Sequence, residues 1–551
     1  MFKDSRYYTL FSISKPFHLY VLTGSYLTKK YNMHLSKILV YYRSINSGNE
    51  RGSFVLINFL NNSEKRRLQF AEILSRQEDW TLLSELAQQL NYSDRTLKDD
   101  IVFLKNNFTD FQVQTSHHGV RLIFEHNKGL RSLYQKILTE SVAYHFLEII
   151  FMDEGKTISE LADSFFISSS TLYRIINQIN DSIRQYDCFI ETNPCRIIGS
   201  EKNIRYFFYQ YFFEKHSPLE WPYKTIHENS LDKLLIFFTD FVPLPIDFSH
   251  YNDFKLVTVV NLIRYQNNHY VDTDNFEINF DEIIPDLSIY ADIFQSFEDS
   301  LGVKFNNDLI NQLFTPFVQE GFSLSYERLI EKTRENKTMA AEVSLLIKLL
   351  DKLSTDNDIP LVNKERVILE MQNTTHLEYQ KPQSGHILYN NNKYFSEAIR
   401  YKFPVFYNDL YEGMIAYRKL QDKPITEDGI DFFICSLFTY WKNLVPELHK
   451  KFDKIKVLVI SNHHILHADM LKDFIQSEFT EQLVVDIYMD NHLSLSMLED
   501  LNYDFIVTNF PLPKLESKRN IYIENVPTVN DLIKIEEAVN RIVSVREQQN
   551  I

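Results

Sequence analysis

The sequence from residue 157 to residue 180, TISELADSFFISSSTLYRIINQIN, contains two predicted helices joined by a tight turn. Thr157 and Glu160 have the spacing of a capping box, and a serine at the turn can cap the second helix. Apolar residues recur at helical spacing in both halves, so one face of each helix can be buried. An apolar helix over 141–152 precedes this pair, and a hairpin pattern around the Asn-Pro pair at 193–194 follows it. This order is typical of a winged helix-turn-helix module.

The same order of elements is predicted roughly 76 residues earlier in the chain, from residue 65 to residue 124. A short helical stripe is followed by an apolar helix over 82–90 and, after a break at Asn91-Tyr-Ser93, by a helix over 94–105. Two alternating segments then flank His117-His118-Gly119 as a hairpin. Because the unit is duplicated, each copy supports the interpretation of the other. A structural three-helix module that touches no DNA is the alternative for either copy.

The third helices of the two copies differ in the groups that they offer to a duplex. Residues 168–178 contain no carboxylate and offer hydrogen-bonding groups that suit phosphates and base edges. The helix over 94–105 mixes basic groups with Asp94, Asp99 and Asp100, which phosphates would repel. We therefore expect the second copy to make the main groove contact and the first to add backbone contacts. The predicted contact residues are Ser169, Ser170, Thr171, Tyr173, Arg174, Asn177 and Gln178 in the second copy and Arg95, Thr96 and Lys98 in the first.

Composition and charge narrow the classes of function. The net charge is −16, but residues 1–60 carry eight Lys or Arg against two Asp or Glu, so a nucleic-acid partner is not excluded. We interpret this basic aromatic stretch as a weakly ordered extension or a misassigned start, with a phosphate-binding arm as the alternative. The 12 glycines form neither a dinucleotide fingerprint nor a P-loop, and the three cysteines form neither a disulfide framework nor a zinc spacing. No apolar run reaches the ~18 residues of a membrane span. We expect a cytoplasmic protein without catalytic residues, cofactor or metal.

The fold class predicted is a multidomain, mainly α protein. Helical patterns continue to about residue 445 with breaks at prolines, and beyond residue 454 short strand patterns alternate with helices, as in a small α/β domain with a mainly parallel sheet. The predicted segments are the extension 1–60, winged modules 61–128 and 129–215, helical blocks 216–325 and 326–447, and the α/β domain 448–551.

This order of domains resembles the Mga/AtxA family of bacterial transcriptional regulators. The motifs that carry the resemblance are Lys65-Arg-Arg-Leu68, Leu83-Ser-Glu-Leu-Ala87, Ser93-Asp-Arg-Thr-Leu97 and Ser168-Ser-Ser-Thr-Leu-Tyr-Arg174. The resemblance implies that the helical blocks are phosphotransferase-system regulation domains (PRDs), in which sugar-uptake carriers phosphorylate histidines. Arg264 fits the expected motif, but Val257 stands where the histidine belongs. His269 and His376 are the phosphorylation candidates that the resemblance leaves, although neither fits the motif.

The resemblance also implies that residues 448–551 are similar to enzyme IIB of sugar transport, in which a cysteine after the first strand accepts the phosphoryl group. Residues 459–467 contain no cysteine, so we expect a non-catalytic sensor or dimer-forming domain. The predicted function is a DNA-binding transcriptional activator, a global regulator or one linked to virulence or metabolism, that responds to sugar phosphotransferase status. Its expected partners are double-stranded DNA, a second copy of the chain and a phosphotransferase carrier protein. The alternatives are an RNA-binding antiterminator and a phosphotransfer protein.

Overall fold

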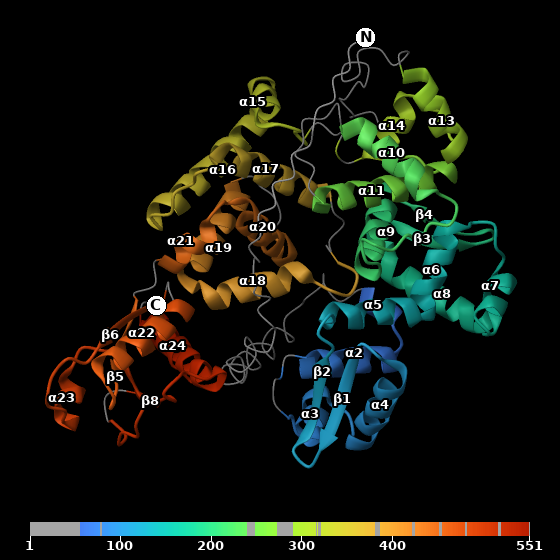
Figure 1. The fold of residues 1–551 in the computed structure, drawn as a ribbon. Helices are drawn as coiled ribbons and strands as arrows, with labels where there is room; N and C mark the ends of the chain where they lie inside the picture. Colours follow the sequence, from blue (N-terminus) through green and yellow to red (C-terminus); the bar gives the residue numbers. More distant parts are fainter. Residues whose placement is uncertain are drawn as a thin grey trace, which may run out of the picture. The chain divides into compact units, whose positions relative to one another are not determined.

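Helices dominate the computed structural model of the chain (Figure 1). The residues that it describes are 56–75, 77, 80–239, 248–272, 290–315, 317, 321–380, 386–420, 425–450, 454–479, 482–515 and 519–549. They form two units. Unit 1 comprises the described residues up to Ser200 together with Tyr211–Glu220 and Ile387–Tyr389, and unit 2 comprises the others. Residues 1–55, most of the predicted extension, lie outside the described residues, whereas Phe59 and Leu60 at its end are buried in unit 1.

The first half of unit 1 is a three-helix module with a hairpin. Ser93 caps the third helix by accepting a hydrogen bond from the N–H of Thr96 (3.1 Å), and Leu97 and Leu104 are buried beneath it. Thr81 pairs with Val120 in the second strand of the hairpin, and Gly119 has a φ of 127° at a point where a Cβ would collide with the Thr81 carbonyl. The elements are η1 (Leu56–Phe59), α2 (Asn62–Ser75), α3 (Leu83–Leu90), α4 (Asp94–Asn107), β1 (Phe111–Ser116) and β2 (Gly119–Phe124).

The second half of unit 1 repeats this order. Thr157 and Glu160 form the predicted capping box, and Ser168 accepts a hydrogen bond from the N–H of Thr171 (3.1 Å). Strands β3 and β4 pair antiparallel as the predicted hairpin. The elements are α5 (Leu130–Glu140), α6 (Val142–Met152), α7 (Ile158–Ser164), α8 (Ser169–Ile183), η2 (Arg184–Tyr186), β3 (Cys188–Thr192) and β4 (Cys195–Gly199).

Helix α9 (Glu201–Lys215) contributes residues to both units. In unit 1 its buried Glu214 accepts backbone hydrogen bonds from Ile387 (2.5 Å), Leu388 (2.8 Å) and Tyr389 (3.0 Å). Burial raises the pKa of Glu214 to about 7, even though the three N–H donors act in the opposite direction. The 387–389 segment therefore belongs to the same unit as the two three-helix modules, and the sequence did not predict this.

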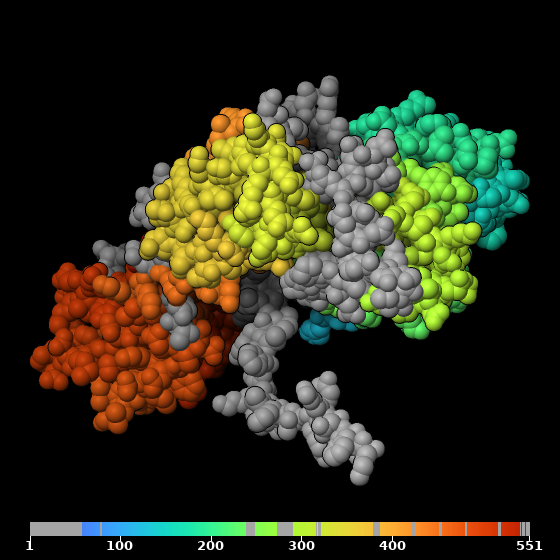
Figure 2. Space-filling model, turned by 90° about the horizontal axis from the view of Figure 1, so that it is seen from above, coloured from blue at the N-terminus to red at the C-terminus, as the bar shows by residue number. Residues whose placement is uncertain are grey.

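Unit 2 contains the helices that follow α9. In its central part α17 and α20 pack together over a core that includes Leu350, Met371, Leu410 and Trp441. The surfaces of α15 and α16 are continuous in the space-filling view, where both helices are yellow (Figure 2). The elements are α10 (Glu228–Thr239), α11 (Phe248–Gln266), α13 (Ala291–Leu301), α14 (Asn307–Phe314), α15 (Tyr326–Glu335), α16 (Lys337–Asp356), α17 (Lys364–Gln380), α18 (Asn391–Lys402), α19 (Pro404–Leu420), α20 (Glu427–Tyr440) and α21 (Leu444–Lys450).

The C-terminal part of unit 2 is a four-stranded parallel sheet in the order β6-β5-β7-β8, as the alternating pattern predicted. Strand β5 (Ile455–Ile460) is buried on both faces of the sheet. Val457 and Val459 belong to the hydrophobic core on one face, and Leu458 and Ile460 belong to the core on the other. The elements are β5 (Ile455–Ile460), α22 (Ile465–Glu478), β6 (Leu483–Ile487), α23 (Leu495–Asp500), β7 (Phe505–Thr508), β8 (Arg519–Tyr522) and α24 (Val529–Gln549). Within the described part of the chain, no helix combines the length and the apolar character that a membrane span requires.

Candidate nucleic-acid interface

Helix α8 buries one face and presents the other to solvent. Leu172, Ile176 and Ile179 are buried, as the helical spacing predicts, whereas Ile175, which the same spacing predicts to be buried, is half-buried. Tyr173 is 46% exposed, and the Arg174 side chain has no hydrogen bond or ion pair within the described residues. Of the predicted contact residues, those exposed are Ser169, Ser170, Tyr173, Arg174 and Asn177, whereas Thr171 and Gln178 are half-buried.

The N-terminus of α8 concentrates hydroxyl groups. The capping Ser168 hydroxyl lies 2.8 Å from the Ser170 hydroxyl and 2.9 Å from the Thr171 hydroxyl. A helix N-terminus favours anions through its free N–H groups and its dipole, and hydroxyl groups can bind phosphate oxygens. The N-terminal end of α8 is therefore chemically suited to contact a phosphate backbone. The next two turns expose Tyr173, Arg174 and Asn177, which are suited to contact base edges in a groove.

The Gln178 side chain forms a hydrogen bond within unit 1. Its side-chain amide donates a hydrogen bond to the carbonyl of Asn58 in η1, which packs against α8. The ring of Phe59, in the same short helix, contacts Tyr144 (5.4 Å between ring centroids). Of the residues predicted on α8, Gln178 is thus the one whose amide nitrogen is already engaged in this structure. No local pattern could reveal this partner, which lies 120 residues away.

On α4 one part of the sequence interpretation is wrong. Asp100 does not share the exposed surface with Arg95 and Lys98, because it is fully buried. Its carboxylate accepts hydrogen bonds from Arg66 (2.5 and 2.9 Å) and from the Nε of Arg67 (2.9 Å). The hydrogen bond to Asp100 also raises the pKa of Arg66. Repulsion of phosphate by Asp100 is therefore largely neutralised.

The other predicted groups on α4 lie on its outer side. Arg95 and Lys98 are exposed and have no ion pair within the described residues, and Thr96 is half-buried with its hydroxyl 2.8 Å from that of Ser93. Asp94 and Asp99 are exposed beside them, so this surface has mixed charge. The helix can add cationic contacts to a duplex, but its surface is less favourable to phosphate than that of α8.

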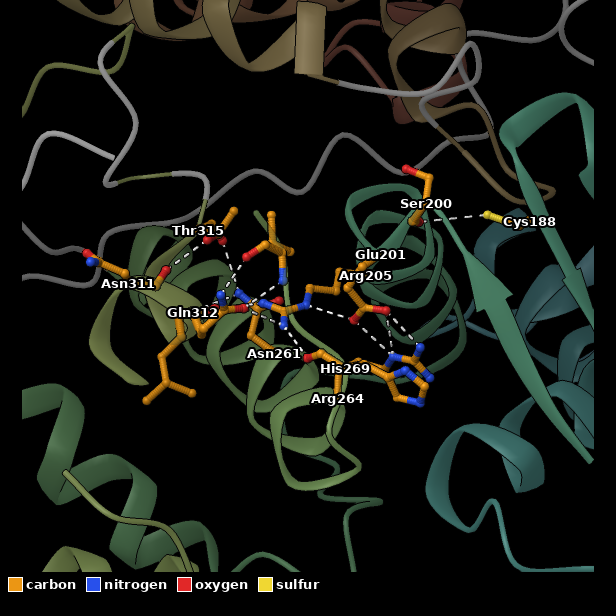
Figure 3. A network of polar contacts seen from close by, with 12 residues as sticks. Cys188, Ser200, Glu201, Arg205, Asn261, Arg264, His269, Asn311, Gln312 and Thr315 are labelled. Carbon is orange, nitrogen blue, oxygen red and sulfur yellow. Dashed lines mark hydrogen bonds and ion pairs between the residues drawn. The ribbon is translucent and has the colours of Figure 1, made fainter. Parts of the chain in front are cut away.

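Polar contacts at the start of unit 2 surround Arg264, the arginine of the PRD motif (Figure 3). Arg264, which is 0% exposed, donates to Glu201 from Nη2 (2.7 Å) and Nε (3.0 Å), and the Nε of Arg205 donates to the same carboxylate (2.9 Å). Arg205 also donates to the carbonyls of Gln312 (2.8 Å) and His269 (3.0 Å). Burial alone would raise the pKa of Glu201, but the hydrogen bond and charge of Arg264, with Arg205, lower it. The motif arginine is thus bound by a carboxylate of the chain itself.

The two candidate phosphorylation sites are half-buried and lie in different helical blocks. His269 follows α11. Its backbone N–H donates a hydrogen bond to the carbonyl of Arg264, and its carbonyl accepts one from the Arg205 side chain. The ring of His376 in α17 packs so closely on Gly321 that a Cβ added there would overlap it. Neither residue is a freely exposed imidazole.

The turn after β5 holds polar groups and no cysteine. Ser461 lies 2.8 Å from Nδ1 of His467, and Nε2 of His467 lies 2.8 Å from the Asn525 carbonyl. Within the described residues no three His, Cys, Asp or Glu side chains form a group that could hold a metal ion. Burial raises the pKa of Cys195 to about 11, so this thiol is a poor nucleophile.

Two regions of the chain match known protein families. Residues 126–212 match the Mga helix-turn-helix domain, and residues 227–444 match the M protein trans-acting positive regulator (MGA) PRD domain. A relative from Streptococcus pneumoniae serotype 4, named as a trans-acting regulator, is 30% identical over 86% of this chain and 97% of its own length.

Two further relatives come from Bacillus anthracis. The capsule synthesis positive regulator AcpB is 20% identical over 86% of this chain and 97% of its own length. The anthrax toxin expression trans-acting positive regulator is 20% identical over 86% of this chain and 98% of its own length. Members of this family are transcription regulators and not enzymes. From these matches and the helix-turn-helix and PRD regions, the chain belongs to the Mga/AtxA family of trans-acting transcriptional regulators.

Proposed function

We propose that the chain activates transcription in the cytoplasm by binding double-stranded DNA through two winged modules, residues 61–128 and 129–215. The observation that carries this proposal is the outer face of α8, where Ser170, Tyr173, Arg174 and Asn177 are exposed and no carboxylate occurs between residues 168 and 178. The names of the Bacillus anthracis relatives, which are positive regulators, support activation over repression.

Two modules in one chain raise the effective concentration of each at the duplex once the other is bound. Weak contacts from α4 can therefore add to those of α8. Because Arg174 is the one arginine among the predicted residues of α8, recognition depends on hydroxyl, amide and phosphate contacts and on DNA shape. We expect binding that weakens steeply with salt concentration.

The test is binding of the full chain to a duplex that it enriches from a random-sequence library. The variant Ser170→Ala/Tyr173→Ala/Asn177→Ala removes three exposed groups from one face of α8, and we expect about a tenfold or greater loss of affinity. The matched control, Ser344→Ala/Lys348→Ala/Lys352→Ala, removes exposed groups and two positive charges from α16 in unit 2. Equal affinities of variant and control would contradict the assignment of α8.

We further propose that residues 448–551 support a dimer and that the PRD region responds to sugar phosphotransferase carriers. The match of residues 227–444 to the PRD domain supports the second proposal, with His269 and His376 as the candidate acceptors. Light scattering of the full chain and of a chain ending before residue 448 tests the dimer. Phosphoryl transfer from the general carrier protein, compared between the full chain and His269→Ala/His376→Ala, tests the response, and absence of label on the full chain would contradict it.

A further inference from the structure

Unit 1 contains a cavity of about 640 Å³ between the start of α2, the end of α4 and α5. This volume is in the range of pockets that bind small organic molecules. The residues that line it come from the first winged module and from the helix that leads to the second. None of the predicted DNA contacts contributes to its lining, so it is a separate feature of the unit.

One wall of the cavity is apolar and aromatic. Phe103 and Phe108 contribute from the end of α4, and Ile137 contributes from α5. The guanidinium group of Arg67 lies 3.4 Å from the centre of the Phe103 ring, while its Nε donates to Asp100. Asp100 offsets only part of the charge of Arg67, because the same carboxylate also accepts two hydrogen bonds from Arg66, and Arg67 acts as part of the wall.

The other wall carries two carboxylates. Glu64 accepts a hydrogen bond from the N–H of Asn61 through Oε2 (2.7 Å), and its Oε1 has no hydrogen-bond partner among the described residues. Glu140 lies at the rim, with Lys136 3.0 Å away. Burial raises the pKa of Glu64, the Asn61 hydrogen bond and Arg67 act against this, and the charge of Glu140 adds to it. A positive group in the cavity would relieve this unfavourable environment.

We propose that this cavity binds a small ligand that combines a ring with a protonated amine, with the amine at Oε1 of Glu64 and the ring against Phe108 and Ile137. A charge-assisted hydrogen bond to Glu64 selects the cation, and the aromatic wall favours both the ring and the positive charge. Because the ligand contacts both α4 and α5, it stabilises one arrangement of the first module relative to the linking helix. Binding itself does not depend on the proposed DNA contacts.

The experiment titrates the full chain by calorimetry with three probes of one shape and different charge, namely phenethylamine, 2-phenylethanol and 3-phenylpropionate. We expect a Kd of about 1 mM for phenethylamine, a binding free energy of about −4 kcal/mol that lies well within the limit for a molecule of this size. We expect phenethylamine to bind, the alcohol to bind at least about tenfold more weakly, and the carboxylate not to bind.

Two variants and a control locate the binding. Glu64→Gln keeps the acceptor for the Asn61 N–H but removes the charge, so it reduces phenethylamine affinity to that of the alcohol. Ile137→Trp fills the cavity and abolishes binding of every probe. Glu85→Gln changes an exposed carboxylate outside the cavity and has no effect. Absence of phenethylamine binding, equal affinity for amine and alcohol, or unchanged binding in Glu64→Gln overturns the proposal, whether or not the chain binds DNA. Glu64→Gln alone decides the charge requirement if Ile137→Trp fails to fold.

Discussion

Helices α4 and α8 occupy equivalent places in the two modules, but at one equivalent position α4 has a charged residue and α8 has an apolar one. A shift of 75 residues aligns the capping Ser93 with Ser168, and the buried Leu97 with Leu172. The same shift aligns Asp100, buried between two arginines of α2, with the half-buried Ile175. A carboxylate on a predicted recognition helix therefore need not face the duplex, because it can hold the helix to its own module.

Removing the buried charge of Asp100 is the substitution that we expect to change the molecule most. Asp100→Asn leaves Arg66 and Arg67 without their shared anion, so we expect the first module to lose about 3 kcal/mol of stability. Hydrogen–deuterium exchange of the α4 amides in the full chain measures this locally. The control is Asp99→Asn, which changes the exposed neighbour and leaves exchange in α4 unchanged. Equal exchange in the two variants would show that the Asp100 ion pairs contribute nothing.

The next effect compares the outer faces of the two helices in DNA binding. Arg174→Ala removes the exposed cation of α8, and we expect about a tenfold loss of affinity, with about one unit less in the slope of log affinity against log salt. Arg95→Ala on α4 is expected to cost less than about threefold, because Asp94 and Asp99 already weaken that surface. Gel-shift titrations of both variants in the same buffer decide the order. A larger effect of Arg95→Ala would make the first module the main reader.

A third effect concerns how the preceding helices α7 and α3 begin. Thr157 forms a capping box with Glu160 (2.8 Å from the Thr157 N–H to Oε2), whereas α3 begins after Leu82 without a side-chain cap. We expect Thr157→Ala to lose about 1 kcal/mol and Leu82→Thr to gain up to about that amount, since Glu85 already stands at the matching position. Urea unfolding followed by circular dichroism measures both. If Leu82→Thr destabilises the chain, the half-exposed Leu82 contributes more by packing than a cap can supply.

The sequence predicted the features of these modules that are encoded locally. Helical spacing identified Leu172, Ile176 and Ile179 as buried, and the capping box identified the start of α7. It could not predict which arginine would meet Asp100, or that Gln178 would bond to Asn58, because those partners lie 33 to 120 residues away in the chain. For the same reason the contact of Glu201 with Arg264 was missed, although Arg264 itself was singled out. Local patterns report which residues are buried, and only tertiary packing reports what they are buried against.

The smallest effect concerns the turns before α4 and α8, which place different residues in the same left-handed conformation. Asn91 has a φ of 58° and Phe166 has a φ of 54°, and the Phe166 side chain is 97% exposed. Asparagine tolerates this conformation, whereas phenylalanine is strained in it and has no packing there to offset the strain. We therefore expect Phe166→Gly to stabilise the chain by about 0.5 kcal/mol after the added entropy of the unfolded glycine is subtracted, and Asn91→Gly to change stability by less. Urea unfolding of the two variants tests this difference. A loss of stability in Phe166→Gly would mean that the strain is absent, whereas a gain in stability together with weaker DNA binding would place the exposed ring at the duplex.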